Sequence, residues 1–229
     1  MSIQVTNLRK NIEQQTVLDD ISFKAEGVVA LLGPNGAGKS TLMKILTTYT
    51  LPTSGLAYVS DINVVEEPEK AKKIIGYLPE HNPVYLDLYV REYLEYVANV
   101  RKIPRTKVAE IVERTGLTRE QNKKIKALSK GYRQRVGLAQ AIIHDPKVLI
   151  LDEPTTGLDP NQILEIRNLI TDLGQDRTIL LSTHIMQEVE AICNQVLILH
   201  QGKLVKNESL THIIEEFQTV EKAFYQLTH

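Results

Sequence analysis

Residues 33–41 combine a glycine-rich turn with one lysine and two hydroxyl side chains, a set that can bind phosphate groups. They are Gly33, Pro34, Asn35, Gly36, Ala37, Gly38, Lys39, Ser40 and Thr41, and they fit the phosphate-loop pattern G-x-x-x-x-G-K-[ST]. The glycines let backbone N–H groups point at a phosphate, and the positive N-terminal end of a following helix adds to the attraction. We expect Lys39 to bridge the β- and γ-phosphates of a nucleotide and Ser40 to bind Mg²⁺. The alternative is a glycine turn without a ligand.

Two adjacent carboxylates, Asp152 and Glu153, follow the apolar run 148–151. In α/β proteins ligands bind at the carboxyl ends of parallel strands, and neighbouring residues of an extended chain point to opposite sides. We therefore expect Asp152 to face Mg²⁺ and Glu153 to act as the general base for water. His184 follows another apolar run, 178–181, and is a candidate contact of the γ-phosphate. Acidic residues at an ordinary strand end and a structural histidine are the alternatives.

Short β-rich runs alternate with amphipathic helices around these motifs, which is typical of an α/β fold. The phosphate loop lies between a buried strand and a helix that continues from Thr41 to Leu46. The pattern predicts strands at 3–8, 18–24, 28–32, 74–78, 148–151 and 178–181, and a hairpin over 196–206. The first two strands are expected to form an antiparallel layer.

The stretch 85–145 has a different, purely helical pattern. Apolar residues recur at helical spacing from Val90 and again from Val108, and a third helix is expected to begin after Ser129, a good N-cap, and to end before Pro146. The sequence thus predicts one domain over 1–229. It consists of a nucleotide-binding core at about 1–84 and 146–208, a helical subdomain at about 85–145 and a C-terminal helix at 209–229.

Composition argues against several classes of protein. The 229 residues are 42% hydrophobic and 24% charged, with a formal net charge of −1, so no overall field attracts DNA or RNA. The basic run 123–126 is interpreted as a solvated helix surface. The single cysteine, Cys193, cannot form an internal disulfide and is expected in the core of a protein in a reducing, cytosolic setting. No apolar stretch approaches the roughly 18 residues that span a bilayer, so the chain is not expected to cross a membrane.

The order and spacing of these motifs resemble the ATPase domains of ABC transporters over nearly the whole chain. Residues 128–135 read Leu-Ser-Lys-Gly-Tyr-Arg-Gln-Arg; they depart from the family signature Leu-Ser-Gly-Gly-Gln but keep Ser129 and Gly131. The resemblance implies a P-loop ATPase core with an antiparallel β layer and an inserted helical subdomain, which binds ATP and Mg²⁺. It also implies that Ser129 and Gly131 contact the γ-phosphate held by a second ATPase chain, arranged head to tail with the first.

Three features refine the resemblance. Glu80 stands where the family has glutamine, as in the Tyr-Leu-Pro-Glu variant of ABC-2-type exporters, and it is expected to contact water and Mg²⁺. Ile12 replaces the aromatic residue that stacks on adenine, so base selectivity should be poor. Residues 77–94 resemble in particular the gliding-motility-associated ABC transporter ATP-binding subunits. Four tyrosines in or just after this stretch, Tyr85, Tyr89, Tyr93 and Tyr96, form either helix core with surface hydroxyls or a groove wall that receives a helix of a membrane subunit.

The resemblance implies an assembly in which two ATPase chains, identical or paired, bind integral membrane permease subunits at the cytoplasmic face of the inner (plasma) membrane, without nucleic acid. A soluble ABC-type ATPase acting on DNA or ribosomes is the alternative, but the chain has no sustained heptads and no basic surface. A small-molecule kinase with a phosphate loop would have no need of the signature segment.

Overall fold

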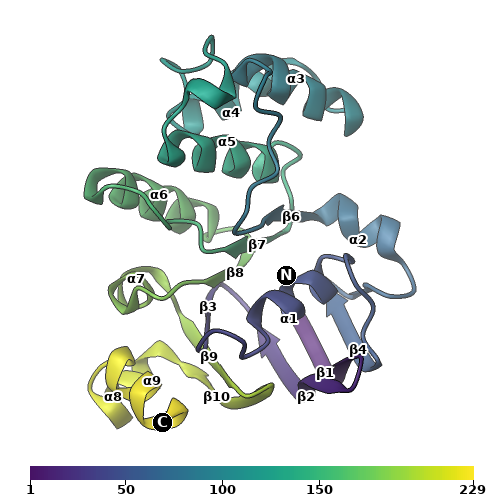
Figure 1. Cartoon of the computed structure of the whole chain (residues 1–229), viewed down its shortest axis with the longest axis vertical. Coiled ribbons are helices and arrows are strands. Elements are labelled where there is room, and N and C mark those ends of the chain that lie inside the picture. Colours follow the sequence, from purple (N-terminus) through teal and green to yellow (C-terminus); the bar gives the residue numbers. More distant parts are fainter.

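The computed structural model describes residues 1–229, and the larger of its two β-sheets carries the predicted motifs (Figure 1). The strand order is β10-β9-β3-β8-β7-β6; all neighbours pair in parallel except β10, which is antiparallel to β9. The strands are β3 (Val28–Leu32), β6 (Ile75–Leu78), β7 (Val148–Asp152), β8 (Thr178–Ser182), β9 (Gln195–His200) and β10 (Lys203–Ser209). The predicted parallel strands and the hairpin are therefore confirmed.

The central strands β3, β7 and β8 are buried on both faces. Because successive side chains of a strand point to opposite sides, Val29 and Leu31 pack into the apolar layer between the two sheets, whereas Ala30 and Leu32 pack toward the helices. This double burial explains why these strands are continuous apolar runs rather than alternating ones.

The second sheet is antiparallel, with the order β2-β1-β4-β5. Its strands are β1 (Ile3–Ile12), β2 (Gln15–Ala25), β4 (Ser54–Val59) and β5 (Ile62–Asn63). The first two are longer than the predicted 3–8 and 18–24, and the sequence did not predict β4 and β5. Helix α1 (Lys39–Leu46) contributes its buried residues Leu42 and Met43 to the apolar layer between the sheets, and this fixes the phosphate loop just before it.

The predicted helical stretch is formed by α3 (Val90–Val100), α4 (Thr106–Arg114) and α5 (Lys130–Ile142), which lie together at one end of the molecule (Figure 1). The interpretation of 123–126 as a helix surface is wrong in part. These exposed lysines lie in a turn that leads into a short 3₁₀ helix (Ile125–Ala127), where Lys126 pairs with Asp87 at 2.7 Å. None of the chain's helices is both long and apolar enough to span a bilayer.

The remaining helices pack around the large sheet. They are α2 (Pro68–Ile74), α6 (Pro160–Leu173), α7 (Met186–Ile192), α8 (Leu210–Phe217) and α9 (Val220–Thr228). The expected single C-terminal helix is in fact two, because Gln218 adopts a left-handed backbone (φ 72°) and Thr219 caps the second helix. Helix α9 then packs on α7 and β9. Cys193 is buried beside α7, as expected, and burial raises the pKa of its thiol to about 12.

Candidate functional site

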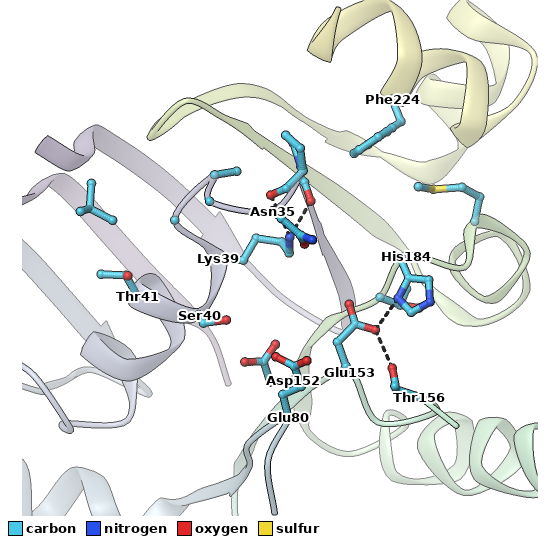
Figure 2. Close-up of a pocket in the computed structure, with 18 residues that line it drawn as sticks. Asn35, Lys39, Ser40, Thr41, Glu80, Asp152, Glu153, Thr156, His184 and Phe224 are labelled. Atoms are coloured by element: carbon cyan, nitrogen blue, oxygen red, sulfur yellow. Dashed lines mark hydrogen bonds and ion pairs between the residues drawn. The ribbon is translucent and has the colours of Figure 1, made fainter. Parts of the chain in front are cut away.

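A cavity of about 730 Å³ opens at the carboxyl ends of four neighbouring parallel strands (Figure 2). The phosphate loop follows β3, His184 follows β8, Asp152 and Glu153 lie at the end of β7, and Glu80 follows β6. The cavity is lined by all nine loop residues from Gly33 to Thr41 together with Val17, Glu80, Asp152, Glu153, Thr156, Thr183, His184, Met186 and Phe224. The fold thus brings together Gly33 and His184, which are 151 residues apart in sequence.

The phosphate loop requires glycine at Gly38, which has a left-handed backbone (φ 104°). A Cβ there would lie 2.6 Å from the side chain of Leu18 and 2.9 Å from the carbonyl oxygen of Val17, so any larger residue would push the loop off the adjacent sheet. Gly38 is also the N-cap of α1 and offers no side chain to its first N–H groups. These N–H groups therefore remain available to an anion at the positive end of the helix.

Lys39 points back over the loop and donates hydrogen bonds to the carbonyl oxygens of Gly33 and Pro34, the latter at 3.2 Å. Burial lowers the pKa of Lys39, while the charges of Glu153, Asp152 and Glu80 oppose that shift. The ammonium group can thus exchange these carbonyl contacts for phosphate oxygens, which would add the negative charge that stabilises it.

Glu153 is the most constrained carboxylate of the cavity. Its Oε2 accepts a hydrogen bond from Thr156 Oγ1 at 3.1 Å and lies 2.8 Å from His184 Nδ1. Its other oxygen, Oε1, has no such partner and points toward the centre of the cavity (Figure 2). The backbone of Glu153 is left-handed (φ 52°), as it is in eleven non-glycine residues of the chain, a conformation that is uncommon for glutamate.

Asp152 and Glu80 form an oxygen-rich region near Ser40 (Figure 2). Asp152 is 4% exposed and accepts a hydrogen bond from Ser182 Oγ at 2.6 Å, while Ser182 Oγ accepts one from the backbone N–H of Glu153 at 3.0 Å. No cluster of three or more His, Cys, Asp or Glu residues that could hold a metal ion exists in the chain. Two carboxylates and a hydroxyl fit Mg²⁺, which is usually held by one or two carboxylates plus substrate phosphates rather than by a full protein cage.

Comparison with known proteins shows the family to which the chain belongs. The family model described as ABC transporter matches residues 18–156. The chain belongs to the ABC transporter family. It is 40% identical over 208 residues to the uncharacterized ABC transporter ATP-binding protein YhcH of Bacillus subtilis, covering 89% of this chain and 68% of that protein. It is 37% identical over 216 residues to the bacitracin transport ATP-binding protein BcrA of Bacillus licheniformis, covering 92% and 71%.

Solved structures agree with this assignment. An ATP-binding subunit of an ABC transporter superposes over the whole of both chains with a TM-score of 0.91 at 28% identity. The dimeric structure of MJ0796, a bacterial ABC transporter cassette, superposes over 90% of this chain and 98% of that one with a TM-score of 0.83 at 24% identity. The mixed α/β cassette fold is therefore established, and the chain is an ATPase and the ATP-binding subunit of an ABC transporter.

The signature residues of this ABC ATPase do not line its own cavity. Ser129 caps α5 by accepting a hydrogen bond from the N–H of Tyr132 at 3.4 Å. Gly131 lies against α6, where an added Cβ would be 2.2 Å from Gln162 Oε1. One chain thus keeps Ser129 and Gly131 apart from the phosphate loop, as expected if they act on a second chain.

Other residues of the cavity carried no signal in the sequence. Thr156 and Thr183 lie beside the motifs of Glu153 and His184. Only the folded chain shows that Thr156 donates to Glu153 and Thr183 to Glu188. Phe224 reaches the cavity from α9, far from any motif. Ile12, by contrast, is 49% exposed at the end of β1 and does not line the cavity.

The four tyrosines differ in burial, and their role as a groove wall for a membrane subunit stays a prediction. Tyr93 is 4% exposed, donates a hydrogen bond to Gln140, and has a pKa that burial raises to about 12. Tyr85 packs its ring 5.7 Å from that of Tyr93 and 5.6 Å from that of Tyr96. Tyr85, Tyr89 and Tyr96 remain about half exposed. Tyr93 is thus core, Tyr85 and Tyr96 pack together at the surface, and Tyr89 lies beside Lys124, whose Nζ is 5.8 Å from the ring centroid.

Proposed function

We propose that the cavity binds ATP with Mg²⁺ and that Glu153 is the general base of hydrolysis. The observation that carries this proposal is the position of Glu153: Oε2 is held by His184 and Thr156, which leaves Oε1 free toward the cavity. A carboxylate held on one side and open on the other can orient a water molecule and accept its proton. His184 and Glu80 are proposed to assist at the γ-phosphate.

The binding roles follow from the same geometry. The loop N–H groups and Lys39 would hold the phosphates, while Ser40, Asp152 and Glu80 would hold Mg²⁺. Bound Mg²⁺ supplies charge neutralisation to the phosphates. Ser182 keeps Asp152 in place through its 2.6 Å hydrogen bond, so the side chain that faces the metal does not rotate freely.

We further propose that two chains pair head to tail, so that Ser129 and Gly131 of one chain complete the cavity of the other. Their distance from their own cavity supports this arrangement, since the N-terminus of α5 would otherwise have no phosphate to bind. The dimeric state of the MJ0796 cassette is consistent with it.

The transport context is a proposal that rests on relatives. BcrA is named for bacitracin transport and SrtF of Streptococcus pyogenes, 34% identical over 206 residues, for lantibiotic transport. We propose an ABC-2-type exporter whose ATPase chains bind permease subunits at the cytoplasmic face of the inner membrane, with the exposed Tyr85, Tyr89 and Tyr96 as the contact surface. A role in gliding motility stays a prediction that rests on residues 77–94.

Glu153→Gln tests the chemistry. The variant should keep ATP affinity, accumulate as a closed dimer and lose hydrolysis by about a hundredfold or more, because the amide cannot accept the proton of water. Glu216→Gln, a surface carboxylate of α8 paired with Lys206, is the matched control and should hydrolyse ATP normally. Turnover of Glu153→Gln close to the unmodified rate would move the base elsewhere, with Glu80 as the next candidate.

Copurification from detergent-solubilised membranes tests the transport context. A tagged chain should bring down a protein with several membrane spans. Recovery of ribosomes or DNA instead would favour the soluble ABC-type ATPase and would contradict the exporter.

A further inference from the structure

Glu188, in α7, is a carboxylate buried behind the cavity rather than on its lining. It is 1% exposed, and none of the ion pairs of the chain includes it. Removing a carboxylate from water is unfavourable unless hydrogen bonds replace the lost hydration. Such a residue needs an explanation that packing does not provide, because an apolar side chain of the same shape would avoid the cost.

The hydrogen bonds of Glu188 converge on one oxygen. Its Oε2 accepts from Thr155 Oγ1 at 3.0 Å and from Thr183 Oγ1 at 2.9 Å, whereas Oε1 is buried without a partner. Both threonines are themselves buried, at 2% and 3% exposure. One atom of α7 therefore links the segment after β7 to the segment after β8.

These two segments are the ones that hold Glu153. Thr155 directly precedes Thr156, and Thr183 directly precedes His184. Thr156 and His184 are the two partners of Glu153 Oε2, at 3.1 Å and 2.8 Å. The carboxylate of Glu188 thus binds the same two segments whose next residues contact Glu153 on the cavity side.

We propose that Glu188 is a positioning residue: by holding Thr155 and Thr183 it sets the geometry of Thr156 and His184 and so keeps Glu153 oriented for hydrolysis. This inference rests on the proposed function of Glu153 as the base. Glu188 is buried and does not line the cavity. Its loss should therefore slow the chemical step and leave nucleotide binding intact, since Lys39 lies across the cavity from His184 and Thr156 (Figure 2).

Two substitutions at Glu188 distinguish the effect of its hydrogen-bond acceptor on kcat from the effect of its packing. Glu188→Leu removes both acceptors, and kcat should fall about tenfold or more because small displacements of catalytic groups are costly. The affinity for MgATP should stay within about twofold, which marks an effect on the chemical step. Glu188→Gln keeps one acceptor oxygen at the same place and should restore most of kcat.

The threonine partners give a test that does not depend on Glu188→Leu folding. The double variant Thr155→Val and Thr183→Val keeps size and shape but removes both donors, and it should reproduce the loss of kcat. Adding Glu188→Gln to it should then change kcat little, because residues of one network are non-additive. Thr178→Val is the matched control: Thr178 is the first residue of β8, the strand that Thr183 follows, is 1% exposed and donates to the carbonyl of Met1 instead.

Thermal unfolding and circular dichroism establish that each variant is folded. A folded double threonine variant with unmodified kcat would overturn the inference, and so would a Glu188→Gln variant as slow as a folded Glu188→Leu. Glu153→Gln, measured in parallel, distinguishes failure of the proposed base from failure of the proposed role of Glu188. If Glu153→Gln hydrolyses ATP normally, the proposed base is wrong; if it is inactive while Glu188→Leu and the threonine variants are not, only the role of Glu188 fails.

Discussion

Lys39 and the three carboxylates that face it define the electrostatics of the cavity. Glu80, Asp152 and Glu153 oppose the effect of burial on the pKa of Lys39, and its ammonium donates hydrogen bonds to loop carbonyls. A nucleotide bound with its metal can replace those carbonyls by stronger, charge-assisted hydrogen bonds. Lys39 is accordingly the residue whose loss should affect binding most.

Lys39→Ala should abolish measurable binding of MgATP. The phosphates would lose the only lysine or arginine of the cavity lining, and each charged hydrogen bond contributes about 1.5–3 kcal/mol. Isothermal titration calorimetry measures the affinity. Lys44→Ala, on the exposed face of the same helix α1, is the control and should bind normally. Unchanged affinity in Lys39→Ala would contradict the assignment of the phosphate loop.

The sequence could predict which charged residues line the cavity, because loop glycines, a lysine and paired acids at strand ends have a local pattern. It could not predict Thr156 as a partner of Glu153, nor Glu188 behind it. Thr156 is only three residues from Glu153, but the contact depends on the turn after β7, whereas Glu188 is 33 residues from Thr155. A threonine or a helical glutamate has the same local appearance whether it is exposed or buried. Phe224 was missed for the same reason.

Among the elements, the contact between α5 and β6 joins the helical stretch to the large sheet. His144, just beyond α5, lies with Nε2 3.0 Å from the carbonyl oxygen of Ile75 in β6. Burial, with the nearby charge of Arg101, lowers the pKa of His144 to about 4. The folded chain therefore keeps His144 neutral where an unfolded chain, with a pKa near 6.5, would bind a proton.

This histidine should make the stability of the fold depend on pH. Between about pH 6.5 and 4 the unfolded state binds the extra proton, so stability falls as the pH is lowered through that window. From pH 7 to pH 5 the contribution of His144 should be about 1–2 kcal/mol of unfolding free energy. Urea denaturation at both pH values measures it.

His144→Gln, which can still donate to Ile75, should lose that part of the pH dependence, while the exposed His212→Gln should keep it. An identical pH dependence in His144→Gln and the unmodified chain would show that His144 is not held neutral by the fold.

Elements with strong local signals were predictable, and those defined by tertiary context were not. The N-cap Ser129 marks the start of α5 in sequence and in structure. Strand β4 was missed because its first three residues are exposed and include a glycine, so no apolar alternation marks it. The break between α8 and α9 depends on a left-handed Gln218, a conformation that glutamine rarely adopts.

In the whole molecule, the two sheets and the helical end carry different residues of the proposed site. The sheets hold the phosphate loop, Asp152 and Glu153, while the helical end presents Ser129 and Gly131 at the start of α5, away from the cavity. A single chain thus contains all the proposed contacts but cannot bring them together. The sequence indicated this only through the family resemblance, because no local pattern shows that two motifs of one chain serve different cavities.

Mixing two inactive variants tests shared sites most directly. Lys39→Ala damages the phosphate loop, and Ser129→Arg fills the space for the γ-phosphate of the other chain. Each should be nearly inactive alone, yet Ser129→Arg should still bind ATP as an isolated chain. A mixed dimer has one cavity with both defects and one with neither. Thr118→Arg, an exposed site outside α5, is the control for the added cation.

We predict that ATPase activity reappears when Lys39→Ala and Ser129→Arg are mixed, in proportion to the mixed dimers counted by native mass spectrometry. We also predict that the unmodified rate per chain rises with protein concentration until dimers saturate. Contradiction would come from Ser129→Arg hydrolysing ATP normally on its own, or from a rate per chain that stays flat far below the dimer dissociation constant, since either result would mean that each chain hydrolyses ATP alone.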